Sequence, residues 1–431
     1  MKKLLLSLFA LASFLIVSCA NNQNEQANTL WKKNPNQILT KEEINKEISD
    51  KMILVQKFLT EKKLDGMLFT QVRNVYWITA GQANVQIVLN KDVGAASLLI
   101  MKDGKKYLVC NGAEAGRMMD GSLRELGYEL KMYNWYEANP VKDVRESIIK
   151  EIAPKGKIGS DAPFPGTVVV AEDFRPLRYS LSETELKRYK WLGQQCTEAV
   201  ESVCKSIKPG MDEYELEALT AIELRSRGIF PTVLLTAVDN RIFNYRHALP
   251  GGAVLENYAM INIVAEKWGM PIAVTRFVYF GDKLPAELEN KLKQTAIVMS
   301  KYEEATKPGK ALSEIFEECK QWYADAGFEG EWMKHHQGGA IGYDDREFVI
   351  YPGVKGTVQN NQGYAWNPTI TGAKVEDTFI ANENGGEVIT KTKDWPVLIV
   401  NLNGKKYEQP AILLRDKTSG KIIEQKNVEV N

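Results

Sequence analysis

The stretch that decides the fold is SIKPGMDEYELEALTAIELRSRG, residues 206–228, because it has a counterpart in ATKPGKALSEIFEECKQWYADAG, residues 305–327. In both, Lys-Pro-Gly ends one helical pattern, and a second helical pattern follows. The second pattern stops at a glycine that lies 18 positions after the first glycine in each copy. This matched spacing predicts an α+β C-terminal half built from two copies of a helix–Lys-Pro-Gly–helix–strand unit.

The helices of this repeat also have predictable beginnings. Ser182–Glu185 and Asp212–Glu215 each place a side-chain oxygen three residues before a glutamate, which is a capping box. Apolar residues recur every three or four positions from Leu186 to Ile207, and again over 285–307. These patterns predict one amphipathic helix before each Lys-Pro-Gly.

The sequence before residue 180 has the character of an α/β unit. A helix is expected at Lys41–Leu64, followed by strands at Gly66–Thr70 and Val75–Ala80. Ser97–Cys110 predicts a hairpin, because an Asp-Gly turn separates two apolar runs. A short strand is expected at Lys157–Ser160.

Composition excludes some classes of partner. The chain has 431 residues, long enough for two domains, with 44% hydrophobic and 26% charged residues. Lysine plus arginine and aspartate plus glutamate number 55 each, so the formal net charge is zero. We therefore expect no nucleic-acid partner. Four cysteines, at positions 110, 196, 204 and 319, lack zinc-ligand spacing and are expected to be packing residues.

The N-terminus, MKKLLLSLFALASFLIVSC, predicts a bacterial secretory signal over residues 1–18. Its ending, Ile16 to Cys19, resembles the lipobox of bacterial lipoproteins, which implies cleavage before Cys19 and lipid attachment to its sulfur. Residues 19–39 are predicted to be a polar tether. The protein is then expected at the bacterial cell envelope, periplasmic or on the outer surface, held by membrane lipid. An ordinary signal peptide with a chance cysteine is the alternative.

Four segments resemble the creatinase/aminopeptidase P family, which is peptidase family M24. They are Glu185–Lys190, Tyr245–Gly251, Thr275–Gly281 and Lys374–Thr378. The resemblance implies an α/β creatinase-like N-terminal domain over 40–180 and a pseudo-symmetric pita-bread domain over 181–400, with a C-terminal extension over 401–431. It also implies hydrolysis of a C–N bond in a small molecule or short peptide, and a homodimer as an expected assembly.

The binuclear metal centre of that family needs two aspartates, one histidine and two glutamates. The resemblance places Asn262, Ala273, Gly339 and Asn367 at four of those positions, with His336 as a substitute for the histidine if the loop is longer. Only Glu376 is retained. Two dications would then lack most of their compensating charge, so no metal cofactor is expected.

The remaining polar residues suit metal-free chemistry. His247 stands where creatinase, a metal-free member of the family, has its general acid and base. Counting 37 positions from Gly210 gives His247, and 37 from Gly309 gives Arg346, so these two are expected to face one pocket. Glu376 is predicted to act with His247 in catalysis by holding a cationic or amidine group. Arg346 is predicted to hold a carboxylate. Other substrate contacts are expected from Asn262, Asn367, His336 and Tyr343.

Other interpretations stay open for the stretch MKHHQGGAIGYDDRE, residues 333–347, and for the whole chain. His247 could be a structural histidine, and Arg346 could form only a local ion pair with Glu347. At most one of His335 and His336 is expected to point into the pocket, because adjacent strand residues face opposite ways. The chain could also be a metal-dependent Xaa-Pro aminopeptidase or dipeptidase. It could instead be an inactive surface lipoprotein that binds a peptide or metabolite.

Overall fold

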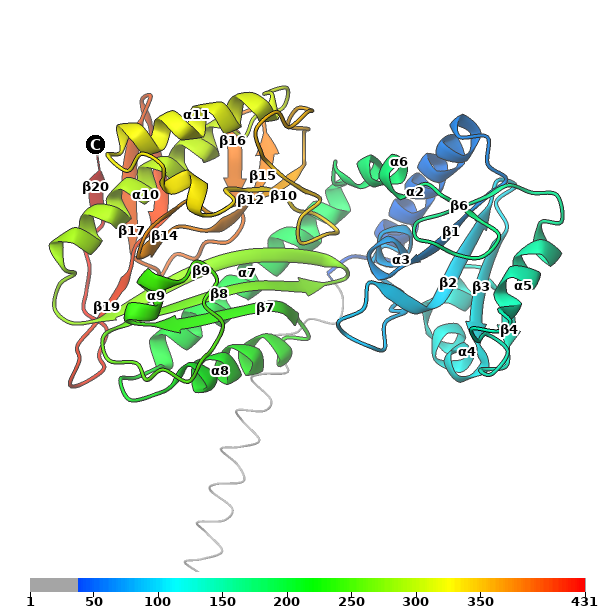
Figure 1. Ribbon diagram of the computed structural model, residues 1–431, viewed down its shortest axis with the longest axis horizontal. Helices are drawn as coiled ribbons and strands as arrows, with labels where there is room; N and C mark the ends of the chain where they lie inside the picture. Colours follow the sequence, from blue (N-terminus) through cyan, green and yellow to red (C-terminus); the bar gives the residue numbers. More distant parts are fainter. Residues whose placement is uncertain (1–37, 431) are drawn as a thin grey trace, which may run out of the picture.

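The computed structural model describes residues 38–430, which form two lobes (Figure 1). The signal, most of the tether and Cys19 lie outside the described residues, so the expectations for them stay predictions. The C-terminal lobe follows helix α7 (Glu183–Ser206), which starts beside the N-terminal lobe. Among the described residues, no helix combines the length and apolarity needed to cross a membrane.

The N-terminal lobe is a mixed six-stranded sheet with the order β4-β3-β2-β1-β5-β6. Its strands are β1 (Gly66–Gln71), β2 (Val93–Met101), β3 (Lys106–Asn111), β4 (Glu129–Tyr133), β5 (Ile158–Ser160) and β6 (Val168–Val169). Its helices are α2 (Lys41–Glu61), α3 (Val72–Ile78), α4 (Gly112–Met118), α5 (Val144–Ile152) and α6 (Ala171–Phe174). The predicted hairpin is confirmed, since β2 and β3 pair antiparallel.

One expected strand of this lobe is wrong. Residues predicted to continue as a strand at Val75–Ala80 instead form α3 directly after β1. Val72, Val75 and Ile78 are all buried and lie three positions apart, which is the spacing of a helix face. A short apolar run does not by itself distinguish a buried strand from a buried helix.

The first half of the C-terminal lobe is a four-stranded sheet with the order β19-β9-β8-β7. Its strands are β7 (Phe230–Val238), β8 (Tyr258–Lys267), β9 (Met270–Phe280) and β19 (Leu413–Arg415). Helices α7 and α8 (Glu213–Arg225) pack against it. Both predicted capping boxes are present, from Ser182 to Glu185 and from Asp212 to Glu215. The short helix α9 (Asn240–Asn244) leads into the segment that carries His247.

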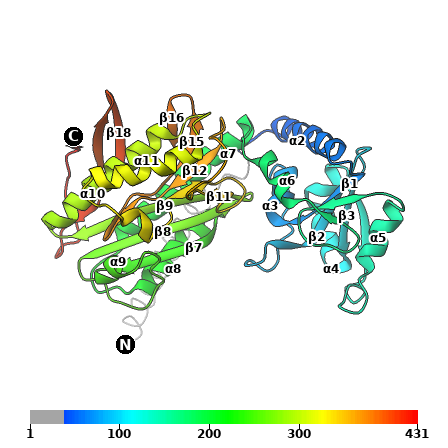
Figure 2. The ribbon, with the colours of Figure 1, turned by 45° about the horizontal axis from the view of Figure 1, so that its top comes forward.

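The second half repeats this arrangement with α10 (Ala286–Ala305) and α11 (Leu312–Asp325). Its five-stranded sheet has the order β11-β10-β12-β15-β16. The strands are β10 (Gly338–Ala340), β11 (Phe348–Val349), β12 (Gly363–Trp366), β15 (Asp377–Asn382) and β16 (Gly385–Val388), with the pair β13 (Thr369–Ile370) and β14 (Ala373–Lys374) beside them. Figure 2 shows α10 and α11 on one side of the sheets and α8 on the other.

The glycines that end the two Lys-Pro-Gly turns make equivalent contacts. The Gly210 N–H donates to the Leu255 carbonyl, and the Gly309 N–H donates to the Val358 carbonyl, both at 2.9 Å. Both glycines have positive φ, the conformation that a residue without a Cβ adopts without strain. The internal repeat predicted from their spacing is therefore confirmed. A three-stranded sheet of β17 (Val397–Leu402), β18 (Lys405–Pro410) and β20 (Val428–Val430) completes the lobe.

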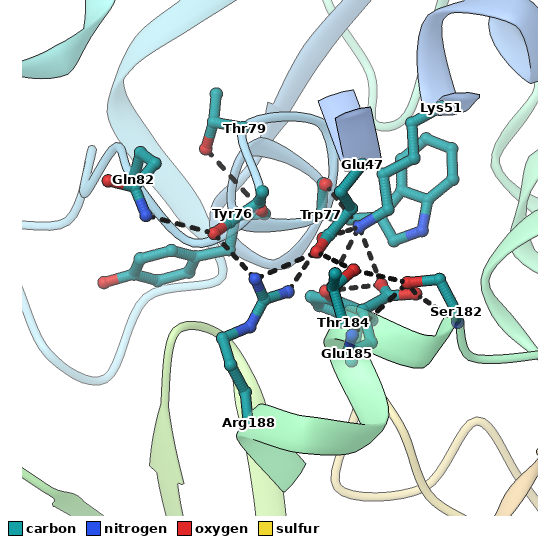
Figure 3. A network of polar contacts seen from close by, with 12 residues as sticks. Glu47, Lys51, Tyr76, Trp77, Thr79, Gln82, Ser182, Thr184, Glu185 and Arg188 are labelled. Carbon is teal, nitrogen blue, oxygen red and sulfur yellow. Dashed lines mark hydrogen bonds and ion pairs between the residues drawn. The ribbon is translucent and has the colours of Figure 1, made fainter. Parts of the chain in front are cut away.

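A buried ionic network joins the two lobes (Figure 3). Lys51 on α2 lies 2.7 Å from a Glu47 oxygen and 2.6 Å from a Glu185 oxygen, and Arg188 lies 2.8 Å from Glu47. Burial alone would raise the pKa of the Glu47 carboxyl, but the charges of Lys51 and Arg188 outweigh it and lower that pKa to about 2. The four charges balance, so the network fixes the N-terminal lobe on α7 without an unpaired buried ion.

The four cysteines at positions 110, 196, 204 and 319 are buried, in agreement with a packing role. Each is nearly inaccessible, and burial raises the pKa of every one of these thiols.

Candidate functional site

The centre of the C-terminal lobe holds a buried glutamate, Glu376, which is 2% exposed. Lys374 Nζ lies 2.9 Å from Glu376 Oε2, and the Thr275 hydroxyl donates to the same oxygen at 2.6 Å. The Asn262 amide also donates to Oε2. Arg346 lies 3.9 Å from the other carboxylate oxygen.

The sheet register brings these groups together. Asn262 on β8 is the cross-strand partner of Thr275 on β9, and the Asn262 amide also donates to the Thr275 hydroxyl at 2.6 Å. The Thr275 N–H donates to the Glu376 carbonyl at 3.1 Å, which links the two half-sheets at this point. Burial would raise the pKa of the Glu376 carboxyl, but Lys374 and Arg346 outweigh it, and the pKa is lowered. Glu376 is therefore a carboxylate held by two cations and two neutral donors.

This arrangement does not fit a binuclear metal centre. Lys374 and Arg346 carry two positive charges against the single negative charge of Glu376, so the surroundings of this carboxylate already have an excess of positive charge. Asn262 donates its amide N–H to that carboxylate, and Ala273 has no ligand atom. At Gly339, an added Cβ would lie 2.1 Å from the Phe348 carbonyl oxygen, so no histidine side chain can stand there without backbone movement. Two dications at this place would meet neither the charge nor the ligands they require.

All three histidines of the chain meet beside this group. His247 and His335 share a hydrogen bond between their Nε2 atoms, 2.8 Å apart. The His335 and His336 rings stack with centroids 4.3 Å apart, and the His247 ring lies 6.0 Å from that of His336. One ring nitrogen from each residue lies within 4.8 Å of the others. We call these three residues the histidine cluster.

The expectation that His335 and His336 point in opposite directions is wrong. They lie between the 3-10 helix Glu331–Lys334 and strand β10, and not in a strand, so the alternation of strand side chains does not apply. Burial, together with the charge of Lys374, lowers the pKa of His335 to about 2. Burial and Arg346 lower the pKa of His336 to about 4. Both rings are therefore neutral at neutral pH.

The pKa of His247 is lowered, first by burial and then by the charge of Lys374, with a smaller effect of Arg346 and an opposing effect of Glu376. That His247 and Arg346 face one pocket stays a prediction. The alternative in which Arg346 pairs with Glu347 is wrong. Glu347 instead forms a buried ion pair with Arg178 at 2.6 Å. Arg346 donates to its neighbour's carbonyl, that of Asp345, at 2.8 Å, and its Nε has no hydrogen-bond partner.

Three expected substrate contacts differ in the structure. Tyr343 is buried in the network between the lobes, where its hydroxyl donates to Glu185 at 2.7 Å, so it is not placed for the predicted contact with a substrate. Asn262 is engaged with Glu376 and Thr275 and is not open to a ligand. Asn367 is buried, and its Oδ1 has no hydrogen-bond partner. Of the predicted contacts, His336 is exposed and Arg346 half-buried.

Sequence reasoning missed two residues of this site, Lys374 and Thr275, and it did not expect His335 and His336 together. Lys374 precedes Glu376 by two positions in the quoted Lys374–Thr378 segment, and extended residues two apart share a face. That spacing was the available signal for the Lys374–Glu376 pair. No comparable signal pointed to the approach of His335 to His247, which lie 88 residues apart.

Comparison with known proteins agrees with this architecture. Residues 187–383 match the model of metallopeptidase family M24. A Xaa-Pro dipeptidase of Pyrococcus horikoshii is 22% identical over 378 residues, covering 80% of this chain and 98% of that protein. The structure of a Xaa-Pro dipeptidase from Bacillus anthracis superposes with a TM-score of 0.64 at 19% identity, over 80% of this chain and 98% of that one. For a prolidase from Pyrococcus furiosus the TM-score is 0.63 at 17% identity, over 78% and 99%. The chain thus has the pita-bread fold of the prolidases, and residues 187–383 form a hydrolase domain of the M24 type.

Proposed function

We propose that the protein hydrolyses a C–N bond in a small peptide or amidino compound without a binuclear metal centre. The observation that carries this proposal is the state of Glu376, whose carboxylate is saturated by Lys374, Arg346, Thr275 and Asn262. The names of the relatives, Xaa-Pro dipeptidase and prolidase, support a short peptide as the substrate.

His247 is the proposed general acid and base. It is exposed, and its Nε2 is hydrogen-bonded to a second imidazole, so one proton is shared between two rings at the surface of the site. A neutral imidazole accepts the proton of an attacking water and returns it to the leaving nitrogen. His335, which is more buried, orients the His247 ring.

The cations beside the histidine cluster supply the binding charge. Lys374 and Arg346 together carry one more positive charge than Glu376 neutralises. A substrate carboxylate, such as the C-terminus of a dipeptide, would complete that balance at Arg346. Glu376 is buried and pairs with both cations, so its proposed role is to hold Lys374 and Arg346 in place and, through them, the substrate.

The test is turnover of Xaa-Pro dipeptides and of guanidino compounds by protein made without a polyhistidine tag and treated with a chelator. We expect His247→Ala to lower kcat by roughly 100-fold or more, which is the usual contribution of a general base. Tyr245→Phe is the matched control, because Tyr245 is exposed and only two residues away. Equal turnover of the His247→Ala variant and the control would contradict the proposal. Saturable binding without any turnover would favour the binding-protein alternative.

The cellular location is proposed from the N-terminal sequence alone. The lipobox-like residues before Cys19 support attachment of the protein to the cell envelope through lipid. Labelling with a radioactive fatty acid tests this proposal, because a Cys19→Ala variant should incorporate none.

A further inference from the structure

The histidine cluster has the composition of a metal site that differs from the centre typical of the M24 fold. Its ligand atoms come from two separate places, namely the segment after α9 for His247 and the segment before β10 for His335 and His336. Among residues 38–430, no other group of three or more histidine, cysteine or acidic side chains brings its ligand atoms close enough together to hold an ion. Each ring offers one nitrogen, and all lie within 4.8 Å of one another.

These distances are close to what a single ion needs. Zinc–nitrogen bonds are about 2.0–2.1 Å long, so two imidazole nitrogens on one tetrahedral ion lie about 3.3 Å apart. The Nε2 atoms of His247 and His335 are 2.8 Å apart, and small ring rotations would open that pair and draw His336 inward. His247 and His336 are more exposed than His335, so this adjustment is expected mainly from their two rings.

We propose that His247, His335 and His336 bind one divalent cation of the borderline class, such as zinc or cobalt, with a fourth position open to water or an anion. Three imidazoles without thiolate or carboxylate favour zinc, cobalt, nickel or copper over magnesium, calcium or manganese. The buried His335 Nδ1 has no hydrogen-bond partner, and the hydrogen bond of this ring to His247 is made by its other nitrogen, Nε2.

The charged residues around the histidine cluster affect how tightly it binds a cation and which fourth ligand that cation prefers. The charges of Lys374 and Arg346 oppose any added positive charge at the histidine cluster, whereas the charge of Glu376 favours it. We therefore expect weaker affinity than in a three-histidine site with an acidic surround, and a fourth ligand that is anionic.

This site goes beyond the proposed function, because it is defined by binding and not by turnover. An ion bound to the His247 imidazole would take up a ring nitrogen and so hinder the proton transfer that the proposed hydrolysis assigns to this ring. Under the proposed function the cation is therefore an inhibitor.

The experiment is a Co²⁺ titration of chelator-treated protein without a polyhistidine tag, followed by visible absorption. Because the chain has only three histidines, every imidazole signal in an NMR spectrum of the same sample reports on this site. We expect one Co²⁺ per chain, shifts of all three ring signals, and displacement of Co²⁺ by Zn²⁺. His247→Ala, His335→Ala and His336→Ala should each weaken Co²⁺ binding by roughly 100-fold or more, since even outer partners of a metal site contribute 10- to 100-fold.

Two control variants show whether the ion binds at the histidine cluster or elsewhere on the chain. Lys334→Ala removes an exposed neighbouring charge, and Asn367→Ala alters a position that the resemblance assigns to the binuclear centre. Both should leave the stoichiometry at one. His336→Gln, at an exposed position, covers the case in which an alanine variant fails to fold. Absence of saturable Co²⁺ binding, or binding that survives loss of two histidines, would overturn the proposal. The spectrum requires no substrate, so it decides the metal site whatever the outcome of the hydrolysis assay.

Discussion

Replacement of Lys374 by methionine tests the ionic arrangement at the centre of the site. Lys374 and Glu376 are 2.9 Å apart, with side chains 7% and 3% exposed. Removing one partner of a buried ion pair costs about 3–5 kcal/mol, because the other charge stays buried without compensation. Arg346, at 3.9 Å, and the donors Thr275 and Asn262 remain on Glu376, so we expect the lower end, about 3 kcal/mol.

That loss is measurable as a change in apparent melting temperature. In a domain of this size, 1 kcal/mol shifts the midpoint by about 2–4 °C, so Lys374→Met should melt about 6–12 °C lower. Lys406→Met is the matched control. Lys406 makes an ion pair with Glu429 of the same 2.9 Å length, but the side chains are 64% and 57% exposed. Such surface pairs contribute about 0–1 kcal/mol. Equal shifts in the two variants would refute the claim that Lys374 neutralises a buried carboxylate.

Three other perturbations address the rest of the molecule. Lys51→Met should cost about 3–5 kcal/mol by differential scanning fluorimetry, whereas Lys46→Met, which breaks an exposed pair of the same spacing on α2, should cost under about 1 kcal/mol. Burial raises the pKa of Glu303 to about 8, so its contribution to stability is complete below its ordinary pKa of 4.5 and is lost as pH rises towards 8. Glu303→Gln should flatten the fall of the melting temperature between pH 5 and 8. Gly339→Ala should cost about 1–3 kcal/mol in urea denaturation through its overlap with the Phe348 carbonyl, and an unchanged midpoint would contradict the crowding seen there.

Much of the C-terminal lobe was predictable from the sequence, because its signals are local. The capping boxes at Ser182 and Asp212 set helix starts, and the glycines at 210 and 309 set turns that only a residue without a Cβ adopts easily. Since the same signals occur twice at equal spacing, the repeat also followed. The prediction of a strand at Val75–Ala80 was wrong. A short apolar run indicates that its residues are buried, but it does not show whether they form a strand or a helix.

The site was less predictable, because its contacts join distant parts of the chain. The loss of carboxylates at Asn262 and Asn367 could be seen in the sequence, but the use of Asn262 as a donor to Glu376 could not. Tyr343 was expected to contact the substrate, yet the two lobes bury it against Glu185, a residue 158 positions away in the sequence. The histidine cluster forms because His335 and His336 follow a 3-10 helix and do not lie in a strand. The rule that adjacent strand residues point in opposite directions therefore did not predict it.

Turnover after chelation tests most directly whether the M24 fold of this protein works without two metal ions. Protein without a polyhistidine tag should be dialysed against a strong chelator, analysed for metal by mass spectrometry, and assayed with Xaa-Pro dipeptides and guanidino compounds. We predict that turnover persists in the metal-free sample and is not raised by Mn²⁺. Turnover that appears only when two equivalents of Mn²⁺ are restored would contradict metal-free hydrolysis.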